Sequence, residues 1–69
     1  MNKPYLVERM VPNGPDDFDW EECCSMAWHK EFIDARNHAE AYHSKDNVRV
    51  MEEIEEIGAR NNVWEHSAY

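Results

Sequence analysis

The strongest constraint on the fold is an apolar stripe between residues 28 and 42. Its members recur at steps of four, three, four and three residues: Trp28, Phe32, Ala35, Ala39 and Tyr42. At about 100° per residue these side chains share one face of a helix, so the stripe predicts a long helix with a narrow apolar seam. A second stripe with the same spacing follows and supplies a partner: Val50, Ile54, Ile57, Asn61, Trp64 and Ala68. The sequence therefore predicts an all-α fold, an antiparallel helical hairpin.

Breaks in the pattern set the bounds of four segments within one small domain, residues 1–69. We expect an extended arm and turn at residues 1–15, a first helix at 17–44, a second helix at 47–65 and a frayed tail at 66–69. Two prolines and an Asn-Gly pair predict the turn. Asp16 or Asp17 is placed to cap the first helix. Gly58 either ends the second helix in a left-handed conformation or is tolerated inside it.

The arm and the first helix both predict association between copies of the chain. Residues 4–11 are β-permissive, and no second strand-like run is evident, so they form either an arm across the helices or a strand that pairs with another copy. The first helix also carries a second apolar set on its opposite face: Cys23, Met26 and Ile33. A chain of this length buries only about 60 % of the surface that its unfolded form exposes. We therefore expect a homodimer or a higher oligomer.

The charge of the chain limits its partners. Seven basic residues against fifteen acidic ones give a net charge of -8. Direct binding to nucleic acid is not expected, because it needs a basic patch. The chain has no apolar run long enough for a membrane span and no recognisable signal peptide. The adjacent Cys23 and Cys24 cannot join distant parts of the chain, which suits a reducing compartment. These features predict a cytoplasmic protein with a basic partner and no membrane contact.

Two acidic clusters are the candidate binding surfaces. The first surrounds two aromatic side chains at the start of the first helix: Asp16, Asp17, Phe18, Asp19, Trp20, Glu21 and Glu22. The second lies on the second helix: Glu52, Glu53, Glu55 and Glu56. Like charges at this spacing repel one another, so the first cluster indicates a docking site for a basic, partly apolar pocket, with Trp20 as its anchor. The structural alternatives are a well-capped helix start and a solvated helix face.

The thiols and imidazoles predict neither a metal site nor an active site. They all fall within the first predicted helix: Cys23, Cys24, His29, His38 and His43. Chelating pairs on a helix lie four residues apart, whereas Cys24 and His29 are five apart and point about 140° away from each other. Only Asp34 and His38 have the chelating spacing, and two ligands do not make a zinc site. A thiol beside acids inside a helix is not activated, and no phosphate loop or Ser-His-Asp set is present. We expect no enzyme, no catalytic residue, no cofactor and no metal.

The two acidic clusters on a short acidic chain give it a resemblance to a class of proteins. In composition, though in no motif, the chain resembles the small accessory proteins that bacteriophages express to bind or inhibit host proteins. The resemblance implies host-directed protein binding, in some cases by imitation of nucleic-acid charge. The predicted order of strand, helix and helix also resembles ribbon-helix-helix repressors. We therefore expect a protein-binding module that regulates or inhibits a partner, with a dimeric ribbon-helix-helix-like or antitoxin-type transcriptional regulator as the alternative.

Overall fold

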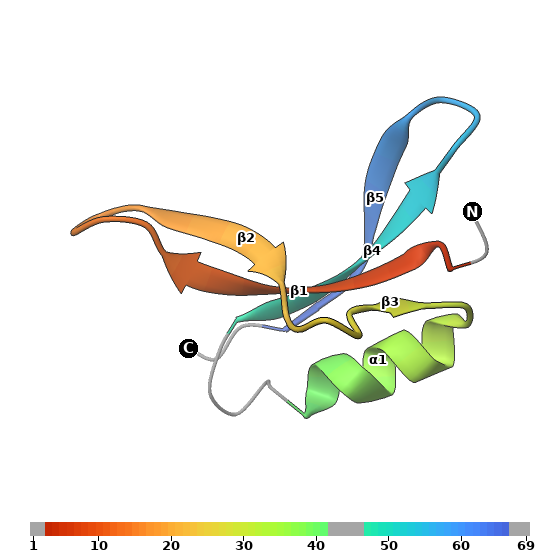
Figure 1. Cartoon of the computed structure of the whole chain (residues 1–69), viewed down its shortest axis with the longest axis horizontal. Coiled ribbons are helices and arrows are strands. Elements are labelled where there is room, and N and C mark those ends of the chain that lie inside the picture. Colours follow the sequence, from red (N-terminus) through yellow and green to blue (C-terminus); the bar gives the residue numbers. More distant parts are fainter. Residues whose placement is uncertain (1–2, 42–46, 67–69) are drawn as a thin grey trace.

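The chain folds mainly into antiparallel β-sheet, as a computed structural model that describes residues 3–41 and 47–66 shows (Figure 1). Its described elements are β1 (Tyr5–Pro12), β2 (Phe18–Glu22), β3 (Trp28–His29), α1 (Phe32–Glu40), β4 (Val48–Ile54) and β5 (Ala59–His66). The strand order is β2-β1-β4-β5, and β3 also pairs with β1. The predicted all-α hairpin is therefore wrong.

The segment expected to be an arm is the central strand of the sheet. One edge of β1 pairs with β4 from Tyr5 to Arg9. The other edge pairs with β2 near its end and with β3 near its start. Because β1 finds its partners within its own chain, the expectation that this segment pairs with a second copy loses its basis.

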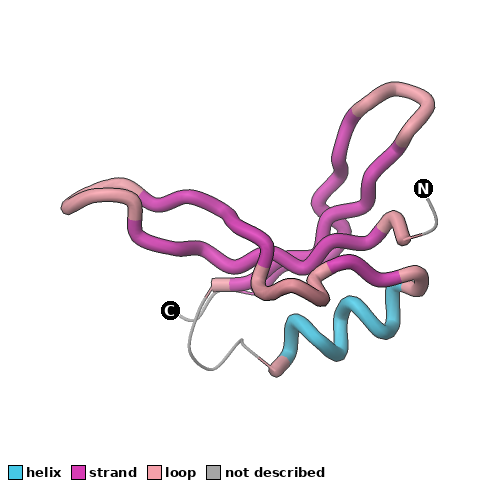
Figure 2. Tube along the Cα trace, viewed as in Figure 1, coloured by secondary structure: helices cyan, strands magenta, loops and turns pink. Residues whose placement is uncertain are grey.

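The helix α1 covers one face of the sheet (Figure 2). Ala35 and Ala39 are fully buried, and their small side chains let the helix approach the sheet closely. They complete a core with Val7, Val48 and Val50. The part of the predicted stripe between residues 32 and 39 is thus helical and faces the core, but the helix has only nine residues. Among the described residues, no helix is long and apolar enough to cross a membrane.

The predicted helix at residues 17–44 is wrong because its first half forms strands. A turn at residues 13–17 reverses the chain between β1 and β2, where the Asn13 N–H donates to the Asp17 carbonyl at 2.8 Å. Gly14 adopts a φ of 122°, which a residue with a side chain rarely takes. An Asn-Gly pair between two runs of alternating apolar residues is a strong hairpin signal. The Asp16 or Asp17 cap therefore belongs to a hairpin turn.

The predicted helix at residues 47–65 is a second hairpin. Val48 and Val50 point to the helix-covered face and are fully buried, while Arg49 and Met51, which alternate with them, lie on the other face. Gly58, at φ 63°, lies in the turn, and its N–H donates to the Glu55 carbonyl at 3.3 Å. Of the predicted tail at residues 66–69, His66 belongs to β5 and the rest lies outside the described residues. Tyr42 and residues 45–46, between the two predicted helices, also lie outside them.

Both hairpins extend beyond the part of the sheet that the helix covers (Figure 1). We call residues 10–22 the first arm and residues 52–61 the second arm. Both predicted acidic clusters lie on these arms or at their bases. The fold therefore presents the two clusters on two separate projections.

Candidate functional site

The first arm presents an exposed aromatic side chain among carboxylates. Phe18 is 60 % exposed. The acidic members of the first cluster are all exposed: Asp16, Asp17, Asp19, Glu21 and Glu22. The arm is held in shape by the turn and by a side-chain hydrogen bond from the Asn13 amide to the Asp19 carboxylate. The first predicted acidic cluster therefore lies together on one hairpin. It occupies a turn and a strand, not the start of a helix.

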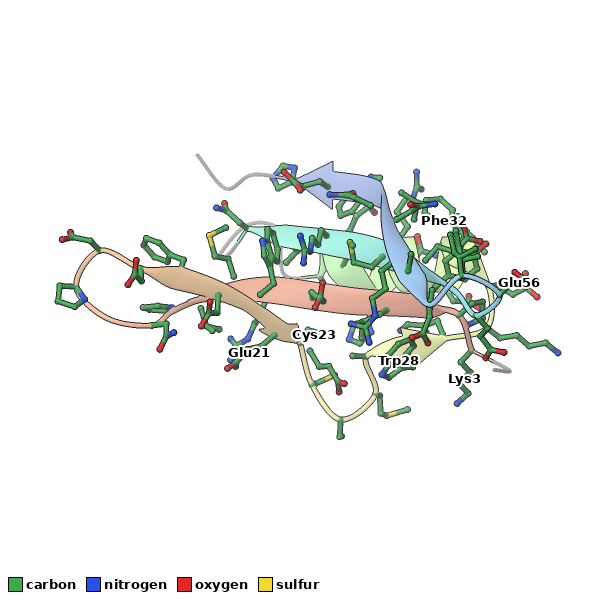
Figure 3. The ribbon with its side chains drawn as sticks, turned by 90° about the horizontal axis from the view of Figure 1, so that it is seen from above. Lys3, Glu21, Cys23, Trp28, Phe32 and Glu56 are labelled. Atoms are coloured by element: carbon green, nitrogen blue, oxygen red, sulfur yellow. The ribbon has the colours of Figure 1, made fainter. Side chains whose placement is uncertain are left out.

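The second arm repeats this arrangement. Ile57, in the β4–β5 turn, is 70 % exposed. Glu55 and Glu56 directly precede it and are exposed, and Figure 3 shows Glu56 at the tip of this arm. Glu52 and Glu53 stand further back on β4 and are partly buried. The second cluster is therefore not the solvated face of a helix: it runs along the end of β4 into the hairpin turn that carries the exposed Ile57.

Trp20, the expected anchor of the docking site, belongs to the folded sheet. Its ring lies under the Arg49 guanidinium, whose central carbon is 4.2 Å from the ring centroid. Arg49 in turn donates to the carboxylate of Glu8 at 2.8 Å, and Glu8 is only 7 % exposed. A guanidinium held between a carboxylate and an aromatic ring stabilises the sheet face that the helix leaves open. Phe18 is consequently the better candidate for the anchor.

A second kind of site, made of thiols and imidazoles, lies beside the helix. Between β2 and β3 the chain leaves the edge of β1 as a loop over residues 23–27. The Cys23 N–H donates to the Val7 carbonyl at 3.1 Å, and the Val7 N–H donates to the Ala27 carbonyl at 2.9 Å. These two bonds hold both ends of the loop against β1. Cys23 starts the loop, as Figure 3 shows, and Cys24 follows it.

The loop, β3 and α1 bring four of these side chains together. The Cys23 and Cys24 sulfurs lie 3.7 Å apart, and each is 3.6 Å from Nε2 of His38 on the helix. Nδ1 of His38 lies 2.7 Å from Nε2 of His29 on β3. The expectation that these residues are spread around a single helix was wrong, because they lie on the loop, on β3 and on α1. His43, the remaining histidine of that set, lies outside the described residues.

The pKa shifts in this cluster favour neutral side chains. Burial, then the hydrogen bond that its S–H donates to the Cys24 sulfur, raises the pKa of the Cys23 thiol to about 12. Burial, then the neighbouring His29, lowers the pKa of His38 below its usual value. At neutral pH the metal-free cluster thus holds a protonated Cys23 thiol and an uncharged imidazole. A protonated thiol is a poor nucleophile, but the same atoms are ligands for a soft metal ion.

The apolar set expected to mediate oligomerisation does not form one surface. Cys23 is buried in the core, whereas Met26 is exposed in the loop. Ile33 is 53 % exposed on the helix. They were grouped because a single helix would place them on one face, and that helix does not exist.

The geometry thus defines a small β-sheet protein with two acidic, apolar-tipped arms and a separate thiol–imidazole cluster. Comparison with known proteins finds no matching protein family, curated protein or solved structure.

Proposed function

We propose that this chain is a small acidic protein-binding module whose two arms dock on a basic, partly apolar surface of a partner protein and regulate or inhibit that partner. The observation that carries the proposal is the repeated construction of the arms. Each places one large apolar side chain, Phe18 or Ile57, in solvent among carboxylates.

The exposure of these two side chains has no benefit for the isolated fold. Neither Phe18 nor Ile57 belongs to the core, and an exposed Phe or Ile forgoes about 1.5–3 kcal/mol that its burial would contribute. Their acidic neighbours repel one another, which costs further stability. A partner that buries the apolar side chain regains its burial energy, and a partner that neutralises the carboxylates removes their repulsion.

The chemistry of the arms selects the partner. Carboxylates favour a surface rich in Arg and Lys, and complementary charge accelerates the encounter between two proteins. The apolar tip requires a pocket, because hot-spot side chains bind in desolvated pockets near the centre of an interface. Nucleic acid offers neither a positive charge nor such a pocket to an acidic arm.

The class of partner that we propose is a host protein. This part rests on the compositional resemblance to phage accessory proteins. Carboxylates on two arms are also suited to occupy a surface that normally binds phosphates, so a nucleic-acid-binding partner fits the proposal. The cysteines are free thiols, and we place the protein in the cytoplasm.

Phe18→Ser is expected to weaken partner binding about thirtyfold, because a hot-spot side chain contributes about 2 kcal/mol or more. Immobilised wild-type protein captures the partner from a host-cell lysate at low salt, and the purified partner is then titrated against each variant. Ile33→Ser is the matched control, since Ile33 is a similarly exposed apolar residue on the helix.

The proposal requires that Ile33→Ser bind like wild type and that the captured protein be basic. Loss of binding in Ile33→Ser with retention in Phe18→Ser would assign the interface to the helix and overturn the role of the arms.

A further inference from the structure

The thiol–imidazole cluster has the dimensions of a zinc site. In a tetrahedral site with Zn–S near 2.3 Å and Zn–N near 2.05 Å, sulfurs lie about 3.8 Å apart and sulfur lies about 3.6 Å from nitrogen. The Cys23 and Cys24 sulfurs are 3.7 Å apart, and each is 3.6 Å from Nε2 of His38. One point therefore exists at bonding distance from all three ligand atoms.

A single linear hydrogen bond does not account for this convergence. Nε2 of an imidazole carries either one N–H or one lone pair, so a linear hydrogen bond explains the contact with one sulfur only. Both sulfurs nevertheless lie at the same distance from Nε2. A metal ion at their centre explains both contacts at once.

His29 supplies the outer interaction that metal-bound histidines normally have. Ligating imidazoles usually donate their other ring N–H to a neighbouring acceptor, which fixes the tautomer and orients the ring. Nδ1 of His38 lies 2.7 Å from Nε2 of His29, and the two rings are nearly perpendicular. If Nδ1 donates this bond, the lone pair of His38 Nε2 faces the two sulfurs.

The supports of the cluster are rigid. The backbone bonds between Val7 and the ends of the loop fix the start of the cysteine segment. His38 lies on α1 immediately before Ala39, which is buried against the sheet. Cys24 and His38 remain partly exposed, which gives an ion a path into the site.

From these observations we propose that Cys23, Cys24 and His38 bind one Zn²⁺ ion, with His29 positioning His38. Zn²⁺ replaces the two thiol protons, which pass to solvent, and the two thiolates cancel its charge. Thiolate and imidazole ligands favour Zn²⁺ over Mg²⁺ or Ca²⁺. Three protein ligands leave the fourth tetrahedral position to water or another exchangeable ligand. This proposal does not depend on the function proposed for the arms.

The test is a titration of the full-length, reduced, metal-free protein with Zn²⁺ by calorimetry and with Co²⁺ by absorption. We expect one ion per chain, a raised melting temperature with Zn²⁺, and the thiolate charge-transfer and intense visible bands of tetrahedral cobalt. Cys24→Ser and His38→Ala should each abolish these bands. Cys24 is the less buried thiol, so its variant is the safer one for folding.

His29→Ala separates a positioning role from a structural one. It should weaken Zn²⁺ binding about 10–100-fold while the cobalt spectrum stays tetrahedral, as loss of an outer-shell partner does. His66→Ala, which alters a histidine stacked on Trp64 outside the cluster, should bind like wild type. Absence of binding at micromolar Zn²⁺, binding that survives in the Cys24→Ser/His38→Ala double variant, or a weak octahedral cobalt spectrum would each overturn the proposal.

Discussion

Val48→Asn is expected to lower the free energy of unfolding by about 2.5–6 kcal/mol, a large share of the stability of a domain of this size. Val48 is fully buried between the sheet and the helix. The substitution loses the burial of a valine, worth about 1.5–3 kcal/mol, and buries an unpaired amide at a cost of about 1–3 kcal/mol. A domain of this size has a total stability of only about 3–10 kcal/mol. Thermal and urea unfolding, followed by circular dichroism, measure the loss.

Ile57→Asn is the matched control, because it makes the same kind of change at a residue that is 70 % exposed. Its free energy of unfolding should stay within about 0.5 kcal/mol of wild type. In a helical hairpin Ile57→Asn would be the more destabilising of the two variants, because Ile57 lies on the predicted apolar seam and Val48 does not. A stable Val48→Asn together with an unfolded Ile57→Asn would therefore contradict the sheet.

The second hairpin shows why helical spacing is a weak signal in this chain. Ile54, Ile57 and Trp64 have helical spacing, but Ile57 lies in a turn. The stronger signal was local: Val48 and Val50 alternate with Arg49 and Met51, and β-branched alternation indicates a strand. Spacing of four and three over a few residues arises readily by chance in a chain that is 42 % hydrophobic.

The first hairpin could have been predicted from its turn. An Asn-Gly pair lies between two alternating runs, from Tyr5 to Val11 and from Phe18 to Glu22. The turn was predicted correctly, but a helix was predicted after it where the chain forms β2. Acidic residues after a proline suit a helix start and a hairpin turn equally well.

The candidate sites were predictable to different degrees. The two acidic clusters are local in sequence, so any fold that exposes them keeps them together. The thiol–imidazole cluster joins residues 23–24 with His38 through tertiary structure, and their spacing carries no signal once a single helix is assumed.

Removing Glu8 alone should cost about 2–4 kcal/mol of stability, which is the second large effect that we expect. Glu8 and Arg49 form a cross-strand pair at 2.8 Å, with 9 % and 23 % of their side chains exposed. Glu8→Leu leaves a largely buried guanidinium without its carboxylate, and breaking one side of a buried pair is strongly destabilising. The double variant Glu8→Leu/Arg49→Met should recover most of the loss, because it buries no unpaired charge.

A double-mutant cycle by urea denaturation measures this coupling. The chain offers a matched pair on the same sheet face: Arg60 lies 3.8 Å from Glu53 and 5.3 Å from the centre of the Trp28 ring, with Arg60 44 % exposed. The double-mutant cycle of Arg60 and Glu53 should give a coupling energy of less than about 1 kcal/mol, as cycles of exposed ion pairs do. Additive effects of Glu8→Leu and Arg49→Met would show that the pair is not coupled.

The central claim is that the acidic arms carry the partner interface, and site-specific photocrosslinking tests it most directly. A photoreactive amino acid is placed at position 18, at position 57 or, as a control, at position 33 on the helix, and each protein is irradiated in host-cell lysate. We predict that positions 18 and 57 both crosslink to the same basic protein, at peptides rich in Lys and Arg, and that position 33 does not. Crosslinking from position 33 alone, or to an acidic surface, would contradict the account.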